Sequence, residues 1–294
     1  GGAGNDIITV NTGTDTVLDL GGGGSGGESD VVVVAAGATL TATGIISFTA
    51  TSATENNSTD AGNATLTARA AGSTINVGSA GAGAFTLTGG DGVDIITGGG
   101  GADIITGGGA VDTIIGGAAV DTITGGAGND IITGGAGNDI ITVDSGTDDI
   151  VDLGGSGGSE SDVLVIASGA TVTADNLAGF TATSATSNNS TDAGNATLTA
   201  KADAVVTIDL SSANSSTKGF TIVGGSGSGA DALTGSAGAD IITGGAAVDT
   251  IIGGAEVDTI TGNAGNDIIT GGAGNDIITV NTGTDTVLDL GGGG

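Results

Sequence analysis

Residues 125–142 read Gly-Gly-Ala-Gly-Asn-Asp-Ile-Ile-Thr twice in direct succession. The same nine-residue repeat returns at 1–9 and at 271–279, and variants of it continue in constant phase through two long blocks. Tandem copies at a fixed period predict a stack of like structural units, each of which buries its apolar side chain only against its neighbours. The 64 glycines of this 294-residue chain therefore belong to an ordered pattern and not to a flexible linker.

Each repeat combines a turn with a short strand. Positions 1, 2 and 4 are glycines, which supply positive φ values, and position 6 is an Asp, which can bond to nearby backbone. Side chains alternate across a strand, so positions 7 and 9 should face outward and position 8 inward. Position 8 is aliphatic in all 14 repeats of the two blocks, namely Ile96, Ile105, Ile114, Ile123, Ile132, Ile141, Ile150, Leu233, Ile242, Ile251, Ile260, Ile269, Ile278 and Val287. The sequence predicts an all-β solenoid whose core is this column.

The composition excludes several classes of function. The chain has no His and no Cys, which removes Ser-His-Asp and Cys-His nucleophiles, imidazole and thiolate metal sites, and disulfides. The chain has three Lys and Arg residues against 33 Asp and Glu residues. Three basic side chains are too few to bind nucleic acid. No apolar run approaches the roughly 20 residues of a transmembrane helix. We therefore expect a protein that is not an enzyme, binds no nucleic acid and has no transmembrane segment.

The periodic aspartates require a partner of opposite charge. Coils of a parallel stack lie about 4.8 Å apart, and two carboxylates at that distance repel by about 3.5 kcal/mol at an effective dielectric of 20. The three basic side chains cannot neutralise them. Carboxylate and main-chain oxygens in irregular turns favour Ca²⁺ over Zn²⁺, Cu²⁺ and Mg²⁺. The sequence therefore predicts several Ca²⁺ ions as cofactors.

The repeats, for example residues 134–142, resemble the RTX, or haemolysin-type, calcium-binding nonapeptide G-G-x-G-x-D-x-U-x. The resemblance covers about half of the chain. It implies a right-handed parallel β-roll in which two repeats complete one coil and Ca²⁺ lies between turns on the same edge. It also implies an extracellular or cell-surface protein, because family members are typically exported in one step by gram-negative bacteria and fold outside the cell.

The predicted metal ligands are the position-6 aspartates. The coil that the resemblance implies would place Asp94, Asp112, Asp130 and Asp148 on one edge of the first block and Asp103, Asp121 and Asp139 on the other. In the second block the edges would be Asp231, Asp249, Asp267 and Asp285, and Asp240, Asp258 and Asp276, and Asp6 belongs to the copy at 1–9. The alternative is that these aspartates only cap turns. Position 4 is Ala110, Ala119, Ala247 or Glu256 in four repeats, where we expect distorted turns that lack their ions.

A longer duplication overlies the short repeat. Residues 48–70 recur with few changes at 180–202, and 271–294 are identical to 1–24, so we expect two long modules and the start of a third, cut from a longer tandem array. The predicted division is the end of an RTX block at 1–24, a Thr/Ala-rich β spacer at 25–88, block 1 at 89–156, a second spacer at 157–225, and block 2 at 226–294. The spacers should continue the solenoid with Phe in the core, and their polar stretches at 55–60 and 187–192 should be surface loops.

The function that these patterns favour is structural. We expect a calcium-stabilised extracellular rod of a surface layer, sheath, filament or adhesin stalk. It would associate with itself into a polymer or lattice through outward isoleucines at position 7, and contact with cell-surface glycans is a further expected interaction. The alternatives are the repeat or secretion domain of an RTX toxin or enzyme, and an ice-binding or adhesive solenoid. Asn-x-Ser/Thr triplets, such as those at Asn56 and Asn188, are better explained by composition and duplication than by glycan attachment.

Overall fold

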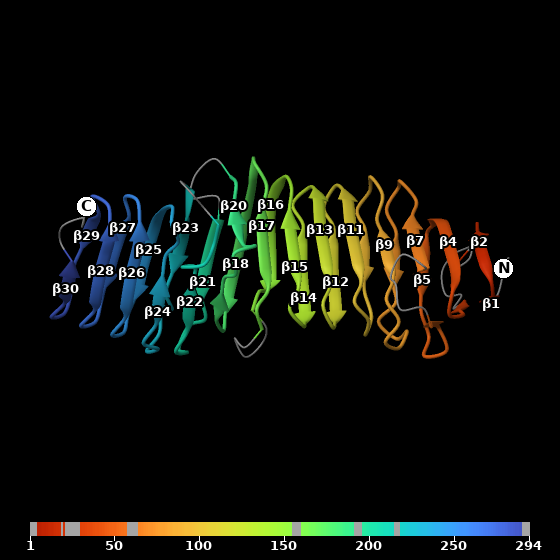
Figure 1. Ribbon diagram of the computed structural model, residues 1–294, viewed down its shortest axis with the longest axis horizontal. Helices are drawn as coiled ribbons and strands as arrows, with labels where there is room; N and C mark the ends of the chain where they lie inside the picture. The colour runs from red at the N-terminus through yellow and green to blue at the C-terminus, as the bar shows by residue number, and fades with distance from the viewer. Residues whose placement is uncertain are drawn as a thin grey trace. The chain divides into compact units, whose positions relative to one another are not determined.

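The structure is a computed structural model, and it describes residues 5–18, 20, 30–57, 64–154, 160–190, 196–214 and 218–289. The chain divides into two compact units, Gly1–Ile141 (unit 1) and Thr142–Gly294 (unit 2). Within the described ranges every regular element is a β-strand, and the paired strands of each unit run parallel (Figure 1). Each unit is therefore a β-solenoid, which confirms the predicted fold class. The division into five sequence segments stays a prediction.

The strands of unit 1 are β1 (Ile7–Val10), β2 (Gly13–Val17), β3 (Val31–Val34), β4 (Ala38–Ile45), β5 (Ser47–Thr49), β6 (Glu55–Asn56), β7 (Ala64–Ala68), β8 (Thr74–Asn76), β9 (Thr86–Thr88), β10 (Ile95–Thr97), β11 (Ile104–Gly109), β12 (Thr113–Ala118), β13 (Thr122–Ala127) and β14 (Ile131–Ala136). β15 (Ile140–Val143) crosses the boundary between the units. Within unit 1 the sheet orders are β1-β3-β6, β2-β4-β7-β9-β11-β13 and β5-β8-β10-β12-β14. Alternate strands therefore belong to the same sheet, as expected when the chain passes each sheet once per coil.

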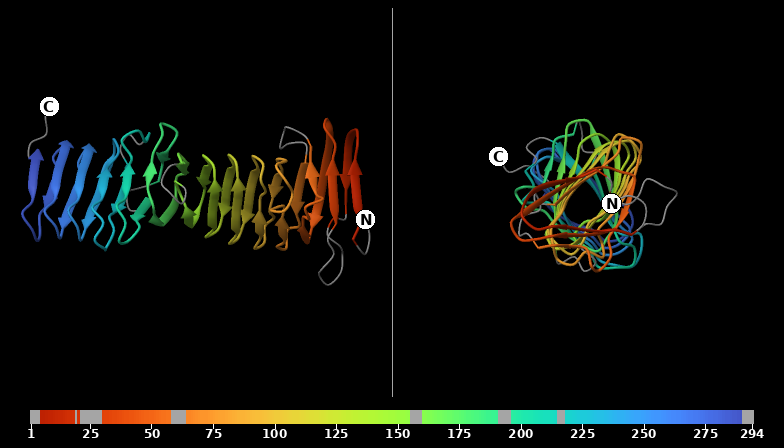
Figure 2. Two further views of the ribbon diagram at one scale, coloured as in Figure 1. Left: turned by 90° about the horizontal axis from the view of Figure 1, so that it is seen from below. Right: turned by 90° about the vertical axis from the view of Figure 1, so that its right-hand side faces the viewer.

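The strands of unit 2 are β16 (Gly146–Asp152), β17 (Val163–Ile166), β18 (Ala170–Leu177), β19 (Phe180–Thr181), β20 (Ser187–Asn188), β21 (Ala196–Ala200), β22 (Thr207–Asp209), β23 (Lys218–Val223), β24 (Ala232–Thr234), β25 (Ala239–Gly245), β26 (Thr250–Ala255), β27 (Thr259–Asn263), β28 (Ile268–Ala273), β29 (Ile277–Thr279) and β30 (Thr286–Asp289). The sheet orders within unit 2 are β16-β18-β21-β23-β25-β27-β29, β17-β20 and β19-β22-β24-β26-β28-β30. Figure 2 shows the coils from β22 to β30 following one another in chain order.

Strand register shows that two repeats make one coil. In unit 1, Ile95 pairs with Thr113 and Thr113 pairs with Ile131, each pair being 18 residues apart. In unit 2, Thr250 pairs with Ile268 at the same spacing. Equivalent positions of alternate repeats therefore lie directly above one another.

The core is the predicted column of position-8 side chains. Twelve of the 14 aliphatic residues are fully buried, while Ile278 and Val287 are half-buried. The isoleucines at position 7 of the two blocks are instead 39–59% exposed, as strand alternation requires. Phe48, Phe85, Phe180 and Phe220 are buried, so the aromatic side chains fill the core of the spacers as predicted.

The prediction that both polar spacer stretches form surface loops was wrong where the structure describes them. Glu55–Asn56 is strand β6 and Ser187–Asn188 is strand β20, and the two asparagine side chains are buried. The Nδ2 atom of Asn56 donates to the carbonyl oxygen of Ala84, and that of Asn188 donates to the carbonyl oxygen of Gly219 at 2.5 Å. Hydrogen bonds of this kind allow an amide to occupy an inward strand position. Residues 58–60 and 191–192 lie outside the described residues.

The glycines at position 1 serve a different purpose from the predicted one. Gly116 does not have a positive φ, but a Cβ there would lie 2.4 Å from the carbonyl oxygen of Gly134 in the next coil. Gly253 has the same relation to Gly271, also at 2.4 Å. Glycine at these two positions therefore lets neighbouring coils approach closely, whereas Gly126 and Gly128, at positions 2 and 4, do have positive φ.

Candidate metal centre

The position-6 aspartates form columns along the edges of each solenoid. Each regular repeat places its Asp directly before the outward residue at position 7, so the carboxylate lies where the turn enters the strand. Twelve of the fifteen predicted ligands are almost completely buried: Asp94, Asp103, Asp112, Asp121, Asp130, Asp139, Asp148, Asp231, Asp240, Asp249, Asp258 and Asp267. Asp6, Asp276 and Asp285 are half-buried. Buried carboxylates need a source of positive potential, and the chain has only three Lys and Arg residues.

Main-chain amides supply part of that potential. The N–H of Asp94 donates to Oδ1 of Asp112 at 2.8 Å, and the N–H of Asp112 donates to Oδ1 of Asp130 at 2.9 Å. On the opposite edge of unit 1, Asp103 donates to Asp121 at 2.7 Å and Asp121 to Asp139 at 2.8 Å. The same series in unit 2 runs from Asp231 to Asp249, Asp267 and Asp285, and from Asp240 to Asp258 and Asp276. Within each unit the structure thus shows the two edges that the resemblance implied, except that this series does not include Asp148.

The second oxygen of many of these carboxylates has no hydrogen-bond partner. Buried Oδ2 atoms without one occur at Asp112, Asp121, Asp249, Asp258 and Asp267. Beside Asp121, a Cβ on Gly116 would lie 2.6 Å from Oδ2 and 2.4 Å from the carbonyl oxygen of Gly134. The space left by the missing side chain is therefore lined by oxygen atoms of both coils, which is the donor set that Ca²⁺ prefers.

Burial also opposes ionisation of these carboxyl groups. Loss of solvation raises the pKa of Asp112, Asp121 and Asp258 to about 7 and that of Asp103, Asp240 and Asp249 to about 6, from the usual 3.8. Neighbouring carboxylates of the same column add to the pKa increase at Asp112, because Asp94 and Asp130 repel its negative charge. A cation between the coils would reverse both effects.

The residues present fit calcium. The donors are carboxylate and carbonyl oxygens, and a cation would supply the partner that five of the buried Oδ2 atoms lack. Among the described residues no three acidic side chains gather around one point. An ion at these turns would therefore take main-chain carbonyl oxygens as further ligands. Bound calcium supplies positive charge, and Asp112, Asp121, Asp249, Asp258 and Asp267 would hold it through Oδ2. The role of each predicted Asp as a ligand stays a prediction.

Two acidic residues outside the regular repeats occupy equivalent places. Oδ1 of Asp30 accepts the N–H of Asp6 at 2.9 Å over a coil of 24 residues. Oδ2 of Asp162 accepts the N–H of Gly154 at 2.6 Å, and both carboxylates are buried. The sequence does carry a signal for both: each Asp follows a Gly/Ser-rich run and directly precedes an aliphatic run, at a spacing longer than the nine-residue repeat.

The turns with a side chain at position 4 differ from the glycine turns. Ala110, Ala119 and Glu256 have φ of 69°, 70° and 65°, whereas Gly128 and Gly137 have φ of 146° and 143°. The structure therefore shows the predicted change of turn conformation at these three positions. That those turns lack an ion stays a prediction.

Asp148 also departs from the pattern of the regular repeats, because it lies within β16 and pairs with Val172 of β18.

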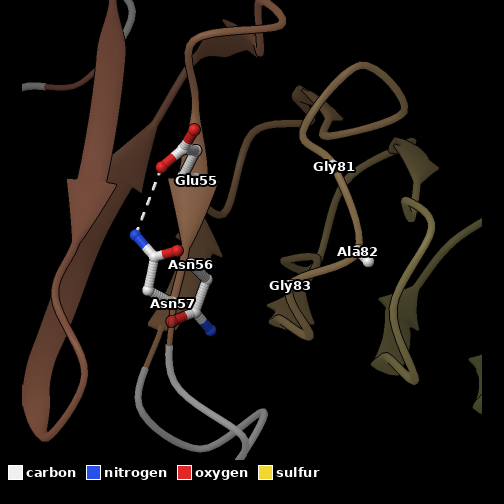
Figure 3. Close-up of a pocket in the computed structure, with 6 residues that line it drawn as sticks. All are labelled: Glu55, Asn56, Asn57, Gly81, Ala82 and Gly83. Atoms are coloured by element: carbon white, nitrogen blue, oxygen red, sulfur yellow. Dashed lines mark hydrogen bonds between the residues drawn. The ribbon is translucent and has the colours of Figure 1, made fainter.

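A pocket of about 330 Å³ in unit 1 lies outside the repeats and is lined by Glu55, Asn56, Asn57, Gly81, Ala82 and Gly83 (Figure 3). Its single carboxylate, Glu55, accepts a hydrogen bond at 3.2 Å from Nδ2 of Asn57. The equivalent position of the second module is Ser187, so the charge is not repeated. The aspartate columns offer far more carboxylate oxygens and remain the better candidate site.

Comparison with known proteins agrees with this geometry. The family model of the RTX calcium-binding nonapeptide repeat (4 copies) matches residues 1–18, 79–114, 88–123, 115–150, 225–260 and 252–287. The matched residues cover just over half of the chain. No curated protein matches the sequence.

Within the described residues there is no helix that is long and apolar enough to span a bilayer.

Proposed function

Because the chain belongs to the RTX calcium-binding nonapeptide repeat family, we propose that it is a calcium-stiffened structural protein that acts outside the cell. It would form part of a surface layer, sheath, filament or adhesin stalk, it would have no enzymatic activity, and it would leave a gram-negative-type cell by one-step secretion. The observation that carries this proposal is the series of buried Asp columns in both units, in which Oδ2 of Asp112, Asp121, Asp249, Asp258 and Asp267 lacks a hydrogen-bond partner. Such columns make rigidity depend on an ion that is abundant outside cells.

Self-association is the second part of the proposal. Outward isoleucines recur on the strand faces of both units, among them Ile131, Ile140, Ile268 and Ile277. Regularly spaced exposed apolar side chains on a flat sheet favour lateral contact between chains. The ice-binding alternative finds less support, because Ile115 interrupts the threonine row between Thr97 and Thr133. The threonines of that row are also only half-exposed.

Replacing Ile131, Ile140, Ile268 and Ile277 together by Thr is expected to abolish assembly without changing calcium-dependent folding. Thr keeps the β-branched shape that suits a strand, so the coils should remain intact while the apolar contact is lost. Electron microscopy and sedimentation with Ca²⁺ and with a chelator would measure assembly, and circular dichroism would measure folding. Val205→Thr, which changes an exposed apolar residue of the spacer, is the matched control. Unchanged assembly of the fourfold variant would refute the lateral contact.

A further inference from the structure

The first aspartate of a column differs from those that follow it. Asp103 accepts two main-chain hydrogen bonds, from the N–H of Phe85 to Oδ1 and from the N–H of Gly99 to Oδ2, both at 2.7 Å. Its successor Asp121 accepts the N–H of Asp103 at Oδ1, and its Oδ2 has no partner. Both carboxylates are buried. The need for a cation is therefore greater at the second coil than at the first.

Unit 2 repeats the pattern on both edges. Oδ1 of Asp231 accepts the N–H of Val206 at 2.9 Å and its Oδ2 accepts the N–H of Gly225 at 2.7 Å. Oδ1 of Asp240 accepts the N–H of Phe220 at 2.5 Å, and its Oδ2 accepts the N–H of Ser236 at 2.7 Å. The following aspartates, Asp249 and Asp258, again have an Oδ2 without a partner.

The place where the preceding strand ends explains the difference. The residue two positions after the last strand residue donates to Oδ2 of the next Asp, as with Gly99 after β10 and Gly225 after β23. In later coils the strand continues through position 2, where Gly108 of β11 pairs with Gly126 and has φ of 120°. The position-2 peptide then belongs to the sheet, and Oδ2 of Asp112 has no partner.

The residue beneath each first aspartate gives an independent indication. The register position of Asp103 is occupied one coil earlier by Phe85, that of Asp231 by Val206, and that of Asp240 by Phe220. These three side chains are apolar and fully buried. A cation between such a residue and the first Asp would contact one carboxylate instead of two, and the two amide dipoles aimed at that carboxylate would repel it.

We propose that Asp103, Asp231 and Asp240 are main-chain caps that close the first coil of their columns without a cation. Calcium is then required only from the next coil onward, at Asp112, Asp121, Asp249, Asp258 and Asp267. Asp94 is intermediate, because Oδ2 accepts the N–H of Gly90 at 2.7 Å while Oδ1 has no partner. This inference rests on the proposed calcium binding. With these caps, the start of each block is already folded without calcium and serves as a template on which the calcium-bound coils fold.

Asn substitutions in the full chain test the assignment. Asp121→Asn and Asp258→Asn are each expected to lose about one bound Ca²⁺ in isothermal titration calorimetry and to shift the folding midpoint to higher calcium. Asp103→Asn and Asp240→Asn, one coil earlier on the same edges, should retain the wild-type number of ions. They should lower the urea midpoint with and without calcium, because Nδ2 cannot accept the N–H of Gly99 or Ser236. Loss of an ion from Asp103→Asn or Asp240→Asn would overturn the proposal.

Hydrogen exchange of the wild-type protein provides a test that needs no variant. Without calcium at pH 7.5, amides of residues 85–99 and 220–236 should stay protected, while those of 112–130 and 249–267 should exchange and become protected only when Ca²⁺ is added. Equal exchange of all four segments without calcium would contradict the caps. A wild-type protein that binds no calcium at all would instead contradict the proposed function, so the two failures are distinguishable.

Discussion

The metal-free protein is expected to lose the β-structure of its repeat blocks beyond their first coils at pH 7.5, and to regain it at pH 5. Burial raises the folded-state pKa of Asp112, Asp121 and Asp258 to about 7 and that of Asp249 to about 6, while unfolded carboxyl groups keep pKa values near 4. A raised folded-state pKa contributes stability below the unfolded pKa, and this contribution is lost as the pH rises through 6 to 7. Far-ultraviolet circular dichroism of metal-stripped protein between pH 5 and 7.5 would measure the transition.

With saturating calcium the pH dependence should have the opposite sign. Calcium binds the ionised carboxylate, so acidification makes protons compete with the ion and weakens the folded state. The urea midpoint of the calcium-bound protein should therefore fall between pH 7.5 and 5, while that of the metal-free protein rises. Metal-free protein that is equally unfolded at both pH values would show that carboxylate charge is not what prevents the coils from stacking.

Gly116→Ala is expected to destabilise unit 1 by on the order of 4 kcal/mol or more and to weaken calcium binding beside it. The new Cβ would lie 2.4 Å from the carbonyl oxygen of Gly134 and 2.6 Å from Oδ2 of Asp121. Both contacts are too short for any real Cβ, so the coils must separate and the oxygen-lined space is lost. Urea unfolding at saturating Ca²⁺ and calorimetric titration would measure the two effects.

Gly37→Ala is the matched control for that substitution. Gly37 lies in the same unit and has φ of 80°, yet a Cβ there would meet nothing within 4 Å. It should therefore cost only the backbone strain of a positive φ, about 1 kcal/mol, and leave calcium binding unchanged. Comparable losses from Gly116→Ala and Gly37→Ala would show that coil spacing is not what requires glycine at position 1.

Most of the fold could be predicted because the repeat carries its own register. The column from Ile96 to Ile269 lies in the core as strand alternation requires, and the two-repeat coil follows the 18-residue spacing of pairs such as Ile95 and Thr113. The placement of the aspartates on two edges within each unit was likewise expected from the family resemblance. These features depend on local periodicity, which a single sequence displays in full.

The remaining features depend on contacts between coils that the period does not encode. Asn56 and Asn188 are buried because carbonyl oxygens of distant residues accept their Nδ2 protons, and nothing near them in sequence indicates this. Asp30 was missed because its coil has 24 residues instead of 18. The difference between Asp103 and Asp121 arises from where the preceding strand ends, although the local sequences are similar.

The 18-residue register also determines how such a chain can gain or lose length. An insertion or deletion of 18 residues inside a block adds or removes one full coil. Each Asp that follows the change then stays on the same edge of the solenoid as before. A change of nine residues would move every later carboxylate to the opposite side, leaving the flanking spacer strands half a turn out of phase. Length changes that arise by unequal recombination should therefore persist only when they add or remove an even number of repeats. Natural length variants of this protein would then differ by whole turns.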